Sequence, residues 1–163
     1  MNLYPKLYLT NIKEITIEML NQNNLKALIL DVDNTLIDYN KNLLDGCIQW
    51  ATNLKNNGIK LCIVSNSNNK EKVKNVANKL QIPYIYFAKK PSKKGFKEAQ
   101  EILKVKNEEI GVVGDQITTD IVGANRSKMF PILVKPISKK EFIITKIKRP
   151  IENIIIKMYE NNK

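Results

Sequence analysis

Apolar and polar positions alternate along the chain in blocks that predict strands and helices in turn. Five short apolar runs are typical of buried strands; they cover residues 25–30, 60–64, 84–87, 110–113 and 131–134. Between and around them, apolar residues at helical spacing predict helices at 11–23, 43–57, 70–80, 93–104, 117–127 and 151–160. Strands that alternate with helices predict an α/β fold, Rossmann-like and doubly wound, with a mostly parallel five-stranded sheet and helices on both faces.

The pattern loosens after residue 135, where the chain becomes basic. We expect a single domain over residues 1–163, with a core at about 25–135 and a basic C-terminal extension at 136–163. The basic residues from position 135 onward are Lys135, Lys139, Lys140, Lys146, Lys148, Arg149, Lys157 and Lys163. The last helix has Ile151, Ile154, Ile155 and Met158 on one face. We expect it to cover the domain, with membrane binding as the alternative.

Bulk composition fits one globular domain. The chain has 163 residues, of which 43% are hydrophobic, enough for a core that folds alone. No apolar run approaches the roughly 18 residues of a membrane span, and the N-terminus has no signal-peptide pattern. We therefore expect a cytoplasmic protein, at most peripheral to a membrane.

The net charge of +11 favours phosphate-bearing partners: nucleic acid, an anionic lipid surface or a phosphorylated small molecule. The chain is also rich in Lys, Asn and Ile, whose codons are AT-rich. Genome composition is therefore an equally good explanation of the charge.

The chain contains no histidine. That absence excludes Ser-His-Asp and Cys-His triads, histidine metal sites and histidine general bases. The two cysteines, Cys47 and Cys62, lack the spacing of metal ligands and are best interpreted as buried thiols. Catalysis must therefore depend on other side chains, with carboxylates as the leading candidates.

Polar side chains follow the predicted strands at the ends where ligands bind in open α/β sheets. They are Asp31 and Asp33 after the first strand, Ser65 and Asn66 after the second, Lys89 and Lys90 after the third, and Asp115 and Asp120 after the fourth. Several carboxylates in one crevice require a cation between them, and oxygen ligands alone favour Mg²⁺. A metal, a positioned nucleophile and compensating positive charge are what phosphoryl transfer needs.

Four of these segments resemble, in order and spacing, the motifs of the haloacid dehalogenase (HAD) superfamily of aspartyl-phosphate phosphatases. The segment 28–36, LILDVDNTL, resembles motif I, and 61–66, LCIVSN, resembles motif II. Lys90 before Pro91 resembles motif III, and 112–120, VVGDQITTD, resembles motif IV. Four motifs in order make the resemblance specific.

The resemblance implies a role for each matching residue. Asp31 would be the nucleophile and Asp33 the general acid and base. Ser65 and Asn66 would bind the phosphate, and Lys90 would stabilise its charge. Lys89, Lys93 and Lys94 compete with Lys90 for this role, and Lys90 is preferred because Lys-Pro is the pattern of the subclass.

The same resemblance implies a Mg²⁺ site. The side chains of Asp31 and Asp115 and the backbone carbonyl of Asp33 would hold the ion. Asp120 would support it through water.

The expected substrate follows from what the chain lacks between its motifs. The segments 34–64 and 66–114 are taken up by predicted helices, strands and loops, which leaves no room for a cap domain. The whole chain resembles the small bacterial YqeG-type phosphatases of HAD subfamily IIIA, which are similar to mitochondrial phosphatidylglycerophosphate phosphatases. A lipid phosphate is thus the implied substrate. A soluble phosphomonoester or nucleotide is one alternative, and a non-catalytic RNA- or ribosome-binding module is the other.

Overall fold

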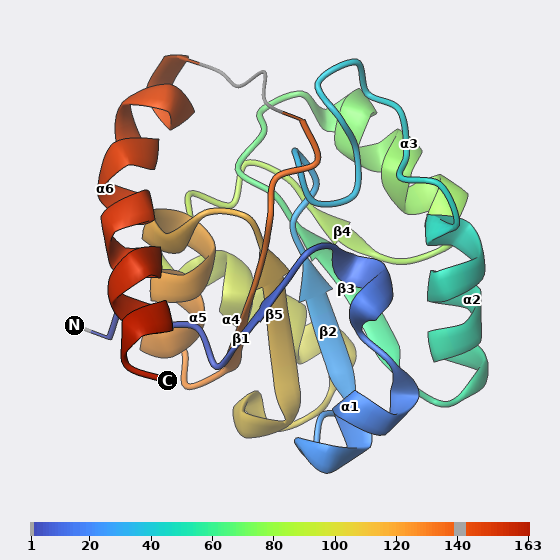
Figure 1. The fold of residues 1–163 in the computed structure, drawn as a ribbon. Helices are drawn as coiled ribbons and strands as arrows, with labels where there is room; N and C mark the ends of the chain where they lie inside the picture. The colour runs from blue at the N-terminus through green and yellow to red at the C-terminus, as the bar shows by residue number, and fades with distance from the viewer. Residues whose placement is uncertain (1, 139–142) are drawn as a thin grey trace.

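The computed structural model describes residues 2–138 and 143–163, without the side chains of 143–147. Lys139 and Lys140 of the predicted basic tail lie outside the described residues, as does the side chain of Lys146. Six strands form one parallel sheet in the order β1-β6-β5-β2-β3-β4 (Figure 1). Their bounds are β1 Leu7–Leu9, β2 Ala27–Leu30, β3 Lys60–Val64, β4 Tyr84–Ile85, β5 Ile110–Gly114 and β6 Phe130–Val134. This confirms the α/β fold with a parallel sheet.

The five-stranded sheet predicted from sequence is one strand short. Strand β1 pairs with β6 at the edge, with Leu7 opposite Ile132 and Leu9 opposite Val134. Its three residues are only half-buried, so they do not form the continuous apolar run by which central parallel strands are recognised.

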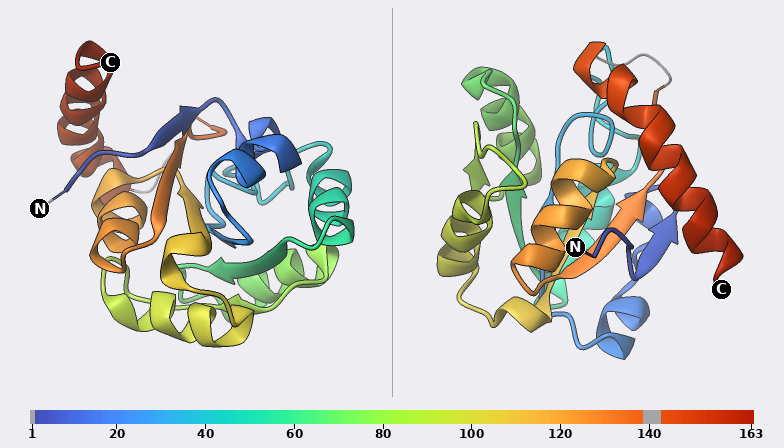
Figure 2. Two further views of the ribbon diagram at one scale, coloured as in Figure 1. Left: turned by 90° about the horizontal axis from the view of Figure 1, so that it is seen from below. Right: turned by 90° about the vertical axis from the view of Figure 1, so that its left-hand side faces the viewer.

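Helices cover both faces of the sheet, because successive residues of a buried strand point to opposite sides. In β2, Leu28 and Leu30 pack in one core cluster, whereas Ala27 and Ile29 pack in the other. The first face is covered by α1 Ile17–Gln22, α2 Cys47–Asn56 and α3 Lys70–Leu80. The second is covered by α4 Lys93–Leu103, α5 Val122–Arg126 and α6 Ile143–Asn161 (Figure 2).

The first predicted helix, 11–23, is divided. A 3₁₀ turn covers Ile12–Glu14, and α1 begins after Thr16, whose hydroxyl accepts a hydrogen bond from the Met19 N–H at 3.1 Å. The threonine side chain thus supplies a helix start in the middle of a continuous apolar pattern.

Helix α6 covers the domain, but not with the face that the sequence pattern suggests. Its half-buried Ile155 and Ile156 pack against Ile117, Ile121 and Leu133. By contrast, Ile151, Ile154 and Met158 are exposed.

Among the described residues, no helix combines the length and the hydrophobicity needed to cross a bilayer. The stretches 34–64 and 66–114 contain no cap domain and are described in full. The carboxyl edge of the sheet is therefore not covered by an inserted domain.

Candidate active site

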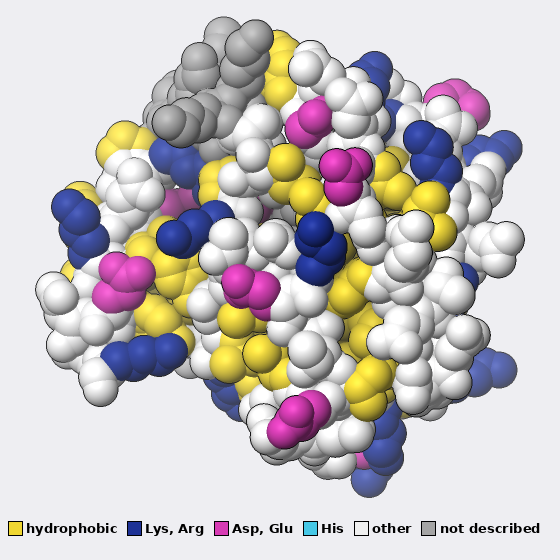
Figure 3. Space-filling model, turned by 45° about the vertical axis from the view of Figure 1, so that its right-hand side comes forward, with side chains coloured by type: hydrophobic (Ala, Val, Ile, Leu, Met, Phe, Trp, Pro, Cys, Tyr) yellow, Lys and Arg dark blue, Asp and Glu magenta, His cyan; other side chains and the backbone are white. Residues whose placement is uncertain are grey.

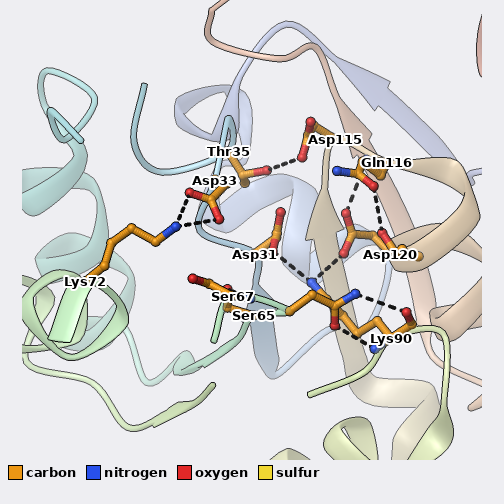
Figure 4. A network of polar contacts seen from close by, with 12 residues as sticks. Asp31, Asp33, Thr35, Ser65, Ser67, Lys72, Lys90, Asp115, Gln116 and Asp120 are labelled. Atoms are coloured by element: carbon orange, nitrogen blue, oxygen red, sulfur yellow. Dashed lines mark hydrogen bonds and ion pairs between the residues drawn. The ribbon is translucent and has the colours of Figure 1, made fainter. Parts of the chain in front are cut away.

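Three neighbouring parallel strands, β5, β2 and β3, deliver the predicted site residues to one edge of the sheet. Asp31 follows β2, Ser65 follows β3 and Asp115 follows β5. The pairing continues past β2, because the Asp31 N–H donates to the Val113 carbonyl at 2.9 Å. Register between the strands thus places Asp31 between the ends of its two neighbours (Figure 4).

A buried ion-pair cluster lies at the centre of the site. The Lys90 Nζ lies 2.8 Å from Asp31 Oδ1 and 2.7 Å from Asp120 Oδ1, and the lysine side chain is only 2% exposed. Lys89, one of the competing motif III lysines, instead places its ammonium over the Phe87 ring, 5.0 Å from the centroid. The structure therefore brings Lys90, and not Lys89, to the carboxylates.

The ionisation of this cluster reflects one cation shared among several carboxylates. Burial by itself would lower the pKa of Lys90, but Asp120 and Asp31 raise it above its ordinary value. The pKa of Asp31 is raised by burial, lowered by Lys90 and raised again by Asp120. Lys90 is therefore held in its charged form, whereas the Asp120 carboxylate still repels a negative charge on Asp31.

The side chain of Asn66 holds the backbone of the Lys90 loop. Its Nδ2 donates to the Lys90 carbonyl at 3.0 Å, and its Oδ1 accepts from the Lys90 N–H at 2.6 Å. Both amide ends of Asn66 are thus used to position Lys90, and its predicted contact with phosphate stays a prediction. Ser65 is buried, and its Oγ accepts from the Ser67 N–H at 3.1 Å. Its phosphate-binding role also stays a prediction.

Three buried carboxylates form a group that could hold a metal ion. One oxygen from each of Asp31, Asp115 and Asp120 lies within 4.8 Å of the others. Burial raises the pKa of Asp115 well above its ordinary value, and Asp31 and Asp120 raise it further, against the effect of Arg149. A divalent cation among these oxygens would relieve that repulsion, and an oxygen-only donor set fits a hard cation.

The close approach of the Asp120 carboxylate to the backbone of residue 114 requires a glycine there. A Cβ at that position would lie 2.1 Å from Oδ2 of Asp120. The same Oδ2 accepts from the Gln116 N–H at 3.2 Å. Any larger residue at 114 would therefore displace the Asp120 carboxylate.

Asp33 lies apart from the buried group, nearer to solvent. Its side chain is 35% exposed, and Lys72 Nζ contacts both of its carboxylate oxygens, at 2.8 and 3.0 Å. The sequence pattern did not single out Lys72. Its place in the first turn of α3, the helix that follows motif II, is the signal that could have identified it, because helices after parallel strands begin at the ligand-binding edge.

Two further residues come from α6. Arg149 donates to the Asp115 carbonyl at 2.6 Å and to the Asp115 carboxylate. Glu152, only 1% exposed, pairs with Arg149 at 3.0 Å. In the sequence, Arg149 is only one of several basic residues near the C-terminus, and nothing local to residue 149 indicates its contact with Asp115.

A cavity of about 470 Å³ opens at this edge of the sheet. Its walls combine the acids Asp31 and Asp33 with three lysines, Lys72, Lys90 and Lys148. The other lining residues are Asn34, Asn66, Ser67, Asn68, Phe87, Gln116 and Thr119. An anionic group that entered the cavity would meet positive charge close to the Asp31 carboxylate.

Comparison with known families matches this chain to one of them over most of its length. The model of the mitochondrial PGP phosphatase family matches residues 1–137. The Bacillus subtilis (strain 168) protein named "Probable phosphatase YqeG" is 40% identical over 153 residues, which cover 93% of this chain and 88% of that protein.

Solved structures show the same fold at lower identity. An uncharacterized protein from Listeria monocytogenes serotype 4b aligns with a TM-score of 0.57 at 19% identity, over 82% of this chain and 99% of that one. The cobalt-bound form of the deoxy-D-mannose-octulosonate 8-phosphate phosphatase from Haemophilus influenzae aligns with a TM-score of 0.53 at 16% identity, over 70% of this chain and 80% of that one.

Proposed function

Because this chain belongs to the mitochondrial PGP phosphatase family, we propose that this HAD-superfamily phosphatase hydrolyses phosphatidylglycerophosphate to phosphatidylglycerol and phosphate. One observation carries the chemistry. Asp31 lines the cavity, pairs with buried Lys90 and belongs to the group of three carboxylates that could hold a metal. It is therefore the carboxylate best placed to meet a bound phosphate.

In the first step, an oxygen of the Asp31 carboxylate attacks phosphorus, and the bond from phosphorus to the glycerol oxygen breaks. Asp33 donates a proton to that oxygen, so that the lipid leaves as an alcohol. Asp33 suits this task because it lines the same cavity and is the more exposed of the two acids. The Asp31 side chain then carries the phosphoryl group.

In the second step, the Asp33 carboxylate removes a proton from water, whose oxygen attacks the phosphoryl group on Asp31. The bond between phosphorus and the Asp31 oxygen breaks, which releases phosphate and restores the carboxylate. Lys90 balances the negative charge near the transferred group in both steps. Ser65 and Asn66 are proposed to bind the phosphate oxygens, Asn66 while it also holds the Lys90 loop.

We propose Mg²⁺ as the resident ion. Asp31 and Asp115 would bind it with their carboxylates and Asp33 with its backbone carbonyl, while Asp120 would support it through water. When bound, Mg²⁺ supplies positive charge that neutralises the phosphate oxygens.

The lysines of the cavity support a lipid substrate with two phosphates. Phosphatidylglycerophosphate carries a terminal phosphomonoester and an internal phosphodiester. Lys90 lies beside Asp31, whereas Lys72 and Lys148 line other parts of the wall. The terminal phosphate would meet Lys90, and the internal one would meet the outer lysines.

The test is phosphate release from phosphatidylglycerophosphate in detergent micelles and from p-nitrophenyl phosphate, with and without Mg²⁺. We expect faster release from the lipid, no release in excess EDTA, and no release by Asp31→Asn with either substrate. Asp45→Asn is the matched control, since Asp45 is an exposed acid outside the cavity, and it should remain active.

Other outcomes would select the alternative functions. Equal or faster release from the soluble ester would favour a soluble phosphomonoester. If the wild type and Asp31→Asn were equally inactive, and RNA bound with a steep salt dependence, a binding module would replace the phosphatase.

A further inference from the structure

Helix α6 exposes a strip of three large apolar side chains. Ile151, Ile154 and Met158 are 61%, 60% and 50% exposed. They lie at positions i, i+3 and i+7, which share one face of a helix. Among the described residues, α2 and α4 each expose only one large apolar side chain, Ile48 and Ile102. The strip on α6 is therefore a feature of this helix and not of the described helices in general.

The strip is exposed although α6 is firmly attached to the domain. The Glu152 carboxylate accepts hydrogen bonds from the Thr118 N–H at 3.1 Å and from its hydroxyl at 3.2 Å. Arg149 joins the same face of α6 to Asp115. The helix runs along the outside of the molecule (Figure 2, right), so its opposite face has no cover from the described part of the chain.

The charges around the strip suit an anionic surface. At 3.6 residues per turn, Lys148 and Lys157 flank the strip on its two sides. Of the acids in α6, Glu152 is buried on the attached face, and Glu160 follows Met158 by two residues, which places it on the far side of the helix. Apolar residues between two lysines are the arrangement of helices that lie in a membrane interface.

We propose that the strip Ile151, Ile154 and Met158 docks on the surface of an anionic lipid bilayer. The apolar side chains would enter the boundary between headgroups and acyl chains, and the flanking lysines would meet anionic headgroups. Lys148 belongs both to this helix and to the wall of the active-site cavity. Docking would therefore bring the cavity to the surface from which a lipid phosphate must come.

This role for α6 rests on the proposed lipid substrate. A nucleic-acid partner would instead call for a single basic patch on the surface. On the face shown in Figure 3, Lys and Arg side chains are scattered, with Asp and Glu between them. Among the side chains that Figure 3 draws in colour, no single basic patch of the kind that binds nucleic acid stands out.

The first experiment measures flotation of the full chain with vesicles. We expect binding to vesicles of phosphatidylglycerol and phosphatidylcholine, and little binding to phosphatidylcholine alone. The triple variant I151Q/I154Q/M158Q should bind the anionic vesicles at least about tenfold more weakly, because apolar burial is lost. The matched control I48Q/I102Q changes exposed isoleucines on α2 and α4 and should bind as the wild type does.

The second experiment tests the charge. Lys157→Gln should weaken binding to anionic vesicles about fivefold, as expected for one lysine near the surface. Lys79→Gln, an exposed lysine of α3, should have no effect. Wild-type binding should also fall as salt rises, because salt screens the attraction.

The outcome separates docking from catalysis. Hydrolysis of p-nitrophenyl phosphate and thermal unfolding are measured for each variant, and both should match the wild type in the triple variant. If the triple variant floats as well as the wild type, membrane docking by this strip is wrong even though Asp31-dependent hydrolysis persists. Docking is equally wrong if the only effect of the three substitutions is to convert a dimer of this chain to a monomer. If docking holds but no ester is hydrolysed, the proposed function fails alone.

Discussion

Two lysine–carboxylate pairs of the active site differ in depth. Lys90 joins Asp31 and Asp120 in a cluster where the side chains of Lys90 and Asp120 are 2% and 1% exposed. Lys72 joins Asp33 at the wall of the cavity, where the Asp33 side chain is 35% exposed. Both pairs have a closest N–O distance near that of a strong hydrogen bond.

Because the two ion pairs differ in depth, they have different effects on stability and catalysis. A buried charge without its partner costs several kcal/mol, so removal of Lys90 should weaken the fold as well as stop the chemistry. A partly exposed pair exchanges its partner for water at little cost, so Asp33 can turn to a substrate. The deep pair holds the proposed nucleophile Asp31 in place, and the shallow pair is the one in which the carboxylate can exchange its partner for a substrate.

Lys90→Met should have the largest effect, because it leaves two buried carboxylates without their cation. We expect the free energy of unfolding of the metal-free protein to fall by about 3–5 kcal/mol and phosphate release to stop. Urea denaturation in EDTA measures the first and phosphate assays the second. Lys79→Met on α3 is the control. A loss of stability below about 1 kcal/mol would remove the distinction between deep and shallow pairs.

Asp33→Asn should damage catalysis more than stability. We expect kcat to fall about 10²–10⁴-fold, the usual contribution of general acid–base catalysis, because no proton is delivered to the leaving group. The free energy of unfolding should change by less than about 1 kcal/mol. Steady-state kinetics measure kcat and urea denaturation measures the free energy of unfolding, with Asp45→Asn as the control. An active Asp33→Asn would assign the proton transfer to another group.

Stabilisation of the fold by a metal at the buried carboxylates should depend on pH. In the metal-free protein the folded-state pKa values of Asp31 and Asp115 are raised. Their protonated forms therefore favour the fold at low pH, and this contribution is lost as pH rises through the folded-state pKa values. Protons also compete with the metal for the same oxygens.

Mg²⁺ should consequently raise Tm more at pH 8 than at pH 5.5. At a hundredfold excess over its dissociation constant, the ion would stabilise the fold by about 2.7 kcal/mol. Differential scanning fluorimetry with and without Mg²⁺ measures the shift. Asp115→Asn should abolish it at both pH values, and a shift that persists in that variant would place the ion elsewhere.

Lys72→Met should have the smallest effect. The Lys72 side chain is 9% exposed, but its partner Asp33 is 35% exposed, so solvent still screens the pair. Loss of Lys72 should therefore raise KM by about fivefold or less, as expected for a screened ion pair of up to about 1 kcal/mol. Kinetics on phosphatidylglycerophosphate measure it, with Lys74→Met on the exposed side of the same helix as the control. An effect on kcat as large as that of Asp33→Asn would show that Lys72 acts in the proton transfer itself.

Local patterns predicted most of the fold and the carboxylate half of the site. The strand ends at Asp31, Ser65 and Asp115 lie where the apolar runs indicated, and the helix at 70–80 has the predicted bounds. Strand β1 was missed because an edge strand of three half-buried residues lacks a burial pattern. Of the cations that pair with the site carboxylates, Lys90, Lys72 and Arg149, only Lys90 was predicted from sequence.

The sequence by itself determined the order along the chain of the helices and of every strand except β1, and the carboxylates at the strand ends. These follow from periodicity and from adjacency along the chain, which need no knowledge of distant contacts. Only the tertiary structure decided which cation meets which carboxylate, because Lys90, Lys72 and Arg149 reach the site from separate loops and helices. It also decided that α6 turns Glu152 inward and Ile151 outward, since the rotation of a helix depends on the surface it packs against and not on its own pattern alone.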